Sequence, residues 1–107
     1  MYTVGIDFGT LSARALLVDV REVATPVFDY THGVINERLP GSERDLPPDW
    51  ELQDPLDYIA AVKATVPAVL AESGIDPGEV IGLGIDFTAC TMLPVKVDGT
   101  PLQTIEE

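Results

Sequence analysis

Basic side chains, cysteines and long apolar runs are all scarce in this chain of 107 residues. Six lysines and arginines stand against 18 aspartates and glutamates, which gives a net charge of −12. A surface with this charge repels nucleic acid and anionic membranes, so neither is expected as a partner. The only cysteine, Cys90, excludes an internal disulfide and is typical of a protein from the reducing cytoplasm. Because its neighbours are mostly apolar, Cys90 is expected to be an inert core residue rather than a nucleophile.

No apolar run approaches the ~20 residues of a membrane span, and no basic leader precedes the first apolar run, so we expect neither a transmembrane helix nor a secretory signal. The apolar fraction of 46% excludes a disordered acidic tail. The length is that of one domain at most, and a chain of this size is able to bury a core.

The stretch from Val4 to Val20 predicts a β-hairpin. Two apolar, β-branched runs, 2–6 and 13–20, flank the polar passage Asp-Phe-Gly-Thr-Leu-Ser. Glycine at the centre of this passage tolerates positive φ and lets a ligand approach the main chain closely. Successive backbone N–H groups in such a turn form an anion-binding concavity, and Asp7 is placed to hold a magnesium ion through water. The same spacing fits a plain hairpin whose polar residues serve only the turn, so the residues alone leave both interpretations open.

The segment after the hairpin predicts an irregular third strand and then a long loop. Apolar residues recur over 23–35 with an interruption at Pro26, which favours a strand antiparallel to the second one. His32 lies in this segment without another His or Cys at metal-ligand spacing, so a metal role is not expected. Residues 36–53 are rich in proline and charge and predict a long connection.

The next segment predicts a helix over 55–73. Asp54 is a favourable N-cap, Pro55 a favourable first residue and Gly74 the natural C-cap. Apolar residues at helical spacing predict the face that packs on a sheet: Leu56, Ile59, Ala60, Val62, Val66, Val69 and Leu70.

A single helical turn at 76–79 is expected to lead into a strand at 80–87. Its nearly continuous apolar sequence predicts a strand buried on both faces. Gly82 and Gly84 lie inside this strand, so they do not form a dinucleotide fingerprint, and the chain also lacks the Gly-Lys-Ser or Gly-Lys-Thr of a P-loop. We interpret the two glycines as allowing another backbone to pack closely. Residues 91–103 predict a last hairpin with Asp-Gly as its turn.

Polar residues directly after the strand at 80–87 form a candidate ligand segment. Segments past the carboxyl end of a strand are where α/β proteins bind ligands. Thr88, Ala89 and Thr91 are small and polar enough to admit a polyol next to the backbone. A tight crossing between two strands is the alternative, and the residues alone favour it.

Four motifs resemble those of a known enzyme family. Asp7-x-Gly9-Thr10-x-Ser12 resembles the first phosphate motif of the ATPase superfamily that contains actin, the heat-shock chaperones and the sugar kinases. Trp-Glu-x-x-Asp-Pro at 50–55 resembles the Trp-x-Glu-Gln-Asp-Pro signature of FGGY carbohydrate kinases, with the glutamate shifted by one position, so it implies a structural place and no ligand role. Asp-Phe-Thr-Ala-Cys-Thr-Met-Leu-Pro at 86–94, with Tyr-Thr-His-Gly-Val-Ile at 30–35, is most similar to the branch of that family that phosphorylates L-ribulose.

This resemblance implies a ribonuclease H-like α/β fold, in which a mixed sheet has three antiparallel strands followed by a helix and a central strand. Residues 1–107 would be the amino-terminal part of the first domain, an incomplete lobe. The implied activity is ATP-dependent phosphorylation of a ketopentose, with conversion of L-ribulose to L-ribulose 5-phosphate in arabinose catabolism as the favoured reaction. ATP and Mg²⁺ are the implied cofactors, and the sugar is the small-molecule partner. Homo-oligomer formation is left open.

The resemblance also implies roles for individual residues. The phosphate-binding role falls on Asp7, which would also hold the metal, and on Gly9, Thr10, Ser12 and Arg14. Ala89 would line the sugar site, and Thr88 is added because it is adjacent. The catalytic base, the second phosphate motif and the adenosine pocket are expected downstream, so the chain alone should be inactive. Alternatives are another FGGY kinase acting on xylulose or ribitol, an actin-like or chaperone-like ATPase, and a non-catalytic interaction module.

Overall fold

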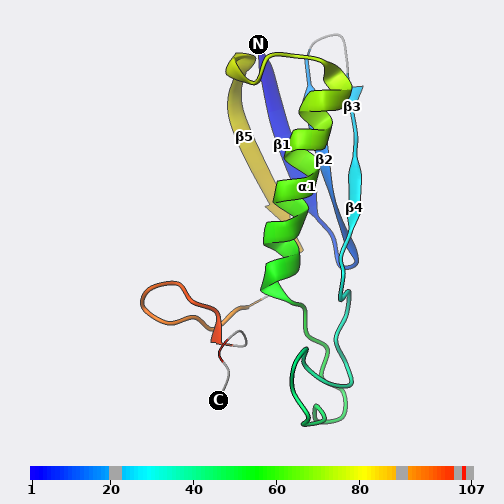
Figure 1. Ribbon diagram of the computed structural model, residues 1–107, viewed down its shortest axis with the longest axis vertical. Coiled ribbons are helices and arrows are strands. Elements are labelled where there is room, and N and C mark those ends of the chain that lie inside the picture. Colours follow the sequence, from blue (N-terminus) through cyan, green and yellow to red (C-terminus); the bar gives the residue numbers. More distant parts are fainter. Residues whose placement is uncertain (20–22, 89–91, 103–104, 106–107) are drawn as a thin grey trace.

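The computed structural model describes residues 1–19, 23–88, 92–102 and 105. One sheet and one long helix, α1 (Pro55–Ser73), make up the body of this part of the chain, and α1 packs on one face of the sheet (Figure 1). The sheet consists of β1 (Tyr2–Phe8), β2 (Ser12–Val18), β3 (Val23–Ala24), β4 (Val27–Asp29) and β5 (Val80–Phe87). A short 3-10 helix, η1 (Pro77–Glu79), leads into β5 as the sequence predicts.

The predicted hairpin is confirmed. β1 and β2 pair antiparallel, with Gly5 opposite Leu16 and Asp7 opposite Arg14. β1 extends two residues beyond the predicted end, so Asp7 lies within the strand, and Ser12 is the first residue of β2 rather than part of the turn.

The third strand is irregular, as predicted, and shorter than expected. β3 and β4 both pair antiparallel with β2, and Pro26 in the gap between them accepts a hydrogen bond from the Ala15 N–H at 3.1 Å through its carbonyl. Pairing with β2 ends at Asp29, because the chain then leaves the sheet for the long connection. That connection extends beyond the sheet and is held by isolated bridges, one of which joins Ile35 to Leu52 (Figure 1).

Helix α1 has the predicted bounds. The Asp54 carboxylate accepts the Leu56 N–H at 2.9 Å, which satisfies one of the free donors at the helix start. Gly74 ends the helix in the left-handed conformation at φ 67°, and its N–H donates to the Leu70 carbonyl at 3.0 Å.

The face by which α1 packs differs partly from the prediction. Ala61, Thr65 and Val69 are buried, whereas Leu56 and Ile59 are 56% and 54% exposed. Because α1 is apolar around much of its circumference, its sequence contains two candidate faces, and periodicity does not distinguish between them. On the sheet, alternate residues of the hairpin form the other half of the core: Val4, Ile6, Phe8, Ala13, Ala15 and Leu17.

β5 pairs parallel with β1 and forms the edge of the sheet in this chain. The prediction that it is buried on both faces is wrong here, since Leu83 and Phe87 are 51% and 69% exposed. The reason is visible in Figure 1, where α1 covers β1 and β2 and leaves β5 uncovered. The close packing predicted at Gly82 and Gly84 is also absent from the described part, because a Cβ at Gly84 would meet no atom within 4 Å and one at Gly82 only Thr3, at 4.0 Å.

The last predicted hairpin is short, with the Lys96 N–H donating to the Thr100 carbonyl at 2.9 Å and the Leu102 N–H to the Pro94 carbonyl at 3.0 Å. Gly99 has φ 87° and donates its N–H to the Lys96 carbonyl at 2.9 Å, and a single bridge joins Val95 to Pro101. Cys90 lies outside the described residues, so its predicted burial stays a prediction. No helix in the described ranges combines the length and apolarity needed to cross a membrane.

Candidate phosphate-binding site

The candidate site is the turn between β1 and β2, which lies at the same end of the sheet as the start of α1 (Figure 1). The Gly9 N–H donates to the Ser12 carbonyl at 2.9 Å and closes the turn. A Cβ on residue 9 would lie 3.1 Å from that oxygen, which is tighter than most real contacts, so glycine favours this close turn. Gly9 is not among the glycines with positive φ, so the turn does not use the conformational freedom that glycine offers there.

Two backbone donors at the tip of this turn are available to a ligand. Thr10 and Leu11 are exposed, and their N–H groups donate to no residue in the described part of the chain. Thr10 also carries a hydroxyl, and a second hydroxyl follows at Ser12, the first residue of β2. Consecutive free N–H groups with adjacent hydroxyls suit a phosphate oxygen.

The carbonyl groups of the same turn are all occupied. The Gly9 carbonyl accepts the Tyr30 hydroxyl at 3.0 Å, and the Leu11 carbonyl accepts the Tyr30 N–H at 3.0 Å. Between them, the Thr10 carbonyl accepts Nε2 of Gln53 at 2.6 Å. Acceptors that would repel an anion are therefore engaged with the protein, while two donors remain open.

Asp7 and Arg14 lie on the sheet face opposite α1. They are cross-strand partners with Arg14 Nε 3.7 Å from Asp7 Oδ2, and both side chains are more than half exposed. Asp86 of β5 is the neighbour of Asp7 on its other side. The five predicted phosphate-site residues thus lie in one hairpin. Two of them, Asp7 and Arg14, place a carboxylate and a guanidinium just behind the turn.

The predicted sugar segment begins beside this turn. Thr88 donates both its N–H and its hydroxyl to the Phe8 carbonyl, at 3.1 and 3.0 Å, which ties the end of β5 to the residue before Gly9. Thr88 therefore lies next to the predicted phosphate-binding residues. Ala89 and Thr91 lie outside the described residues.

A chain of aromatic rings supports the turn from the α1 side. Phe8 stacks on Phe87 with ring centroids 6.0 Å apart and meets Tyr58 edge-on at 5.4 Å. Tyr58 in turn meets Tyr30 edge-on at 5.5 Å. Burial, followed by the charges of Tyr58, Asp7 and Asp57, raises the pKa of Tyr30 to about 12, and burial also raises the pKa of Tyr58. Both hydroxyls therefore stay protonated and remain hydrogen-bond donors at neutral pH.

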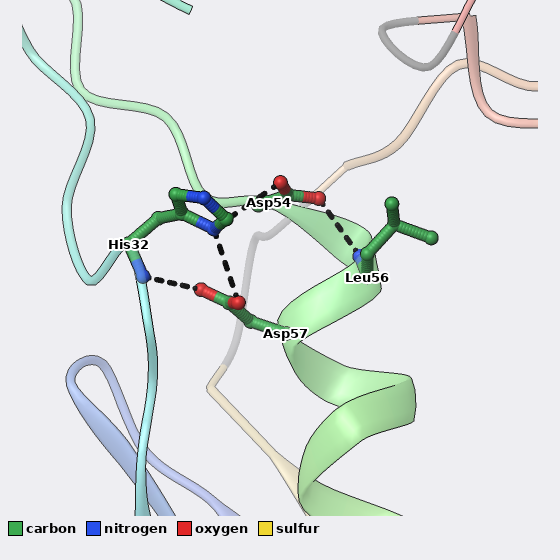
Figure 2. A network of polar contacts seen from close by, with 4 residues as sticks. All are labelled: His32, Asp54, Leu56 and Asp57. Atoms are coloured by element: carbon green, nitrogen blue, oxygen red, sulfur yellow. Dashed lines mark hydrogen bonds and ion pairs between the residues drawn. The ribbon is translucent and has the colours of Figure 1, made fainter. Parts of the chain in front are cut away.

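A polar cluster that sequence reasoning missed joins the chain after β4 to the start of α1 (Figure 2). The buried Asp57 carboxylate accepts the His32 N–H at 2.9 Å, and its second oxygen lies 3.1 Å from His32 Nδ1. Asp54, the N-cap, places an oxygen 3.3 Å from the same ring nitrogen. The only sequence signal was the pair of aspartates at the N-cap and three residues later, which does not identify a partner 25 residues away.

Asp7 is the candidate ligand for a magnesium ion at this turn. Within residues 1–19, 23–88, 92–102 and 105, no group of three or more His, Cys, Asp or Glu side chains is arranged so that it could hold a metal ion. Asp7 is exposed and carries one carboxylate, which fits a magnesium ion that keeps most of its waters and is also bound by substrate phosphates. His32 Nδ1 already contacts the carboxylates of Asp54 and Asp57, and its metal role is not among our predictions.

Comparison with known proteins identifies the relatives. The chain is 58% identical over 103 residues to a ribulokinase from Geobacillus thermodenitrificans, which it matches over 94% of its own length. The chain is homologous to part of the ribulokinases. The chain is also 50% identical over 110 residues to a ribulokinase from Mycolicibacterium smegmatis, which it matches over 99% of its own length. The resemblance to FGGY carbohydrate kinases, and to their ribulose-phosphorylating branch, is confirmed.

These matches concern a small part of each relative. The chain spans about 18% of the length of the Geobacillus ribulokinase and 20% of the Mycolicibacterium one. No protein-family model matches the chain. Among solved structures, a xylulose kinase from Brucella ovis superposes with a TM-score of 0.71 at 21% identity, over 95% of this chain and 20% of that one. This likeness confirms the predicted sugar-kinase-like fold.

Proposed function

We propose that residues 1–107 are the amino-terminal part of the first domain of a cytoplasmic kinase that transfers the γ-phosphoryl group of ATP to L-ribulose. The product would be L-ribulose 5-phosphate, in arabinose catabolism. The observation that carries the proposal is the turn at Gly9, with two free N–H donors and three occupied carbonyls, in a chain 58% identical to part of a ribulokinase.

In this proposal the turn binds and orients the phosphates of the nucleotide. The N–H groups of Thr10 and Leu11 and the hydroxyls of Thr10 and Ser12 donate to phosphate oxygens, and Arg14 adds positive charge nearby. Asp7 holds magnesium through water, and that ion, when bound, neutralises phosphate charge. The net charge of −12 makes these local donors necessary, since the overall field of the chain repels a nucleotide.

The sugar is proposed to lie beside the turn, against Thr88 and Ala89. Thr88 is bonded to the carbonyl of Phe8, directly before the turn, so a polyol there would sit close to the phosphate being transferred. Holding two reactants at this short separation is the main contribution that a protein makes to phosphoryl transfer.

The test is a kinetic comparison on the full-length protein. ATP-dependent phosphorylation is measured with L-ribulose, xylulose and ribitol, and L-ribulose should give the highest kcat/KM. Asp7→Ala should lower kcat by at least ~100-fold through loss of metal positioning, whereas Glu72→Ala, on the exposed side of α1, should leave it unchanged.

Other outcomes would change either the assigned function or the assigned site. A preference for xylulose or ribitol would assign a different sugar kinase. ATP turnover that does not require sugar would favour an actin-like or chaperone-like ATPase, and near-normal kcat in Asp7→Ala would remove Asp7 from the site.

A further inference from the structure

Two residues outside the hairpin contact every carbonyl of the phosphate-binding turn. Tyr30 binds the carbonyls of Gly9 and Leu11, and Gln53 binds the carbonyl of Thr10. We propose that Tyr30 and Gln53 are positioning residues that orient the N–H donors of this turn toward the nucleotide phosphates. The proposal rests on the proposed function and adds how the site is preorganised.

Because the peptide group is planar, a hydrogen bond that fixes the direction of its carbonyl also fixes the direction of its N–H. In a planar trans peptide the C=O of one residue and the N–H of the next lie in one plane and point in opposite directions. Fixing the Gly9 carbonyl on the Tyr30 hydroxyl therefore fixes the direction of the Thr10 N–H. In the same way, Gln53 fixes the Leu11 N–H through the Thr10 carbonyl.

The two positioning residues are themselves held in place. The Tyr58 hydroxyl donates to Oε1 of Gln53, which leaves Nε2 facing Thr10. The Tyr58 ring also packs edge-on against Tyr30, with an interplanar angle of 84°. Tyr30 is buried at 8% exposure, so its hydroxyl has few alternative positions.

The cluster in Figure 2 ties together the two segments that carry these residues. His32 lies two residues after Tyr30, and Asp54 directly follows Gln53. The contacts of His32 with Asp54 and Asp57 join both segments to the start of α1. The phosphate-binding turn is thus fixed by segments that are themselves bound to the start of α1, and not by the hairpin alone.

The experiment uses the full-length protein and two mild substitutions. Tyr30→Phe removes only the hydroxyl, and Gln53→Met removes the amide while keeping side-chain length. Ser73→Ala is the matched control, because it deletes a hydroxyl-to-carbonyl bond of 2.9 Å at the far end of α1. Steady-state kinetics give kcat and KM for MgATP and for L-ribulose, calorimetry measures binding of a non-hydrolysable ATP analogue with Mg²⁺, and thermal unfolding gives Tm.

Loss of one such hydrogen bond should lower kcat/KM for MgATP by about 5- to 10-fold in each variant. The KM for L-ribulose should stay within about twofold of wild type, because that substrate does not contact the turn N–H groups. Ser73→Ala should lower Tm to a similar extent without changing either MgATP kinetics or analogue binding.

The remaining outcomes separate this proposal from the proposed function. If wild type phosphorylates L-ribulose and the two variants match Ser73→Ala in MgATP kinetics, the positioning role is overturned and the kinase assignment stands. A parallel loss for both substrates that follows Tm would also overturn it, since that is general destabilisation. If wild type lacks sugar kinase activity but the variants bind the analogue about 5-fold more weakly, positioning stands and the kinase assignment fails. If wild type binds no analogue, both fail.

Discussion

Removing the Asp57 carboxylate should loosen the segment after β4. Asp57 is only 4% exposed, and its two oxygens accept the backbone N–H of His32 at 2.9 Å and the ring Nδ1 at 3.1 Å. In Asp57→Ala the ring nitrogen keeps Asp54, 3.3 Å away, whereas the backbone N–H loses the acceptor that it has in the wild type.

The size of the effect follows from these contacts. His32 is exposed, so water can replace part of the lost contact at its N–H, and the relevant magnitude is that of a hydrogen bond to a charged group, about 1.5–3 kcal/mol. Relief of repulsion between the neighbouring carboxylates Asp54 and Asp57 offsets part of this loss, and so does the retained ring contact. We therefore expect a net cost near the lower end, about 2 kcal/mol, which corresponds to roughly a 30-fold increase in local opening.

Hydrogen exchange measured by mass spectrometry on the full-length protein reads this opening locally. Peptides covering 30–35 should exchange about 30-fold faster in Asp57→Ala and at the wild-type rate in Glu72→Ala, whose site is exposed on the same helix. Asp57→Asn, which retains one acceptor oxygen, should be intermediate. Unchanged exchange over 30–35 in Asp57→Ala would refute the structural role of this cluster.

Three further predictions concern ionisation, backbone conformation and activity. Tyr30, with a pKa of about 12 against an ordinary value of 10.0, favours folding through its neutral form. This stabilisation is complete below pH 10.0 and is lost as the pH rises through about 12. The difference in tyrosinate absorbance between wild type and Tyr30→Phe should therefore titrate near 12 and not near 10.0. Gly74→Ala should lower the free energy of unfolding by about 1 kcal/mol from its backbone conformation alone, because φ is 67° and a Cβ there would meet no atom within 4 Å; an unchanged Tm would contradict this. Residues 1–107 in isolation should show no ATP-dependent ribulose phosphorylation, because they correspond to about 18% of a ribulokinase, and clear turnover by the purified chain would disprove it.

Elements that local chemistry specifies could be predicted from the sequence. Asp54 and Gly74 mark the ends of α1 because a cap is satisfied by groups within the same few residues. The hairpin of β1 and β2 follows in the same way from two apolar runs around a polar turn. The phosphate candidates fall in this hairpin, so their proximity was predictable as well.

Features that depend on distant partners could not be predicted. The bond from Gln53 to Thr10 joins residues 43 apart, and the contact between His32 and Asp57 joins residues 25 apart. No local pattern marks such pairs, since each side chain is also compatible with a solvated surface. Whether β5 is buried likewise depends on another segment that packs on it. Its apolar residues, such as Leu83 and Ile85, indicate only that such burial would be favourable.

A crystal structure of the full-length protein with magnesium and a non-hydrolysable ATP analogue tests the central claim most directly. The account predicts phosphate oxygens within hydrogen-bond distance of the Thr10 and Leu11 N–H groups, with the magnesium ion on the Asp7 side of the turn. Phosphates bound elsewhere, with this turn facing solvent, would contradict it.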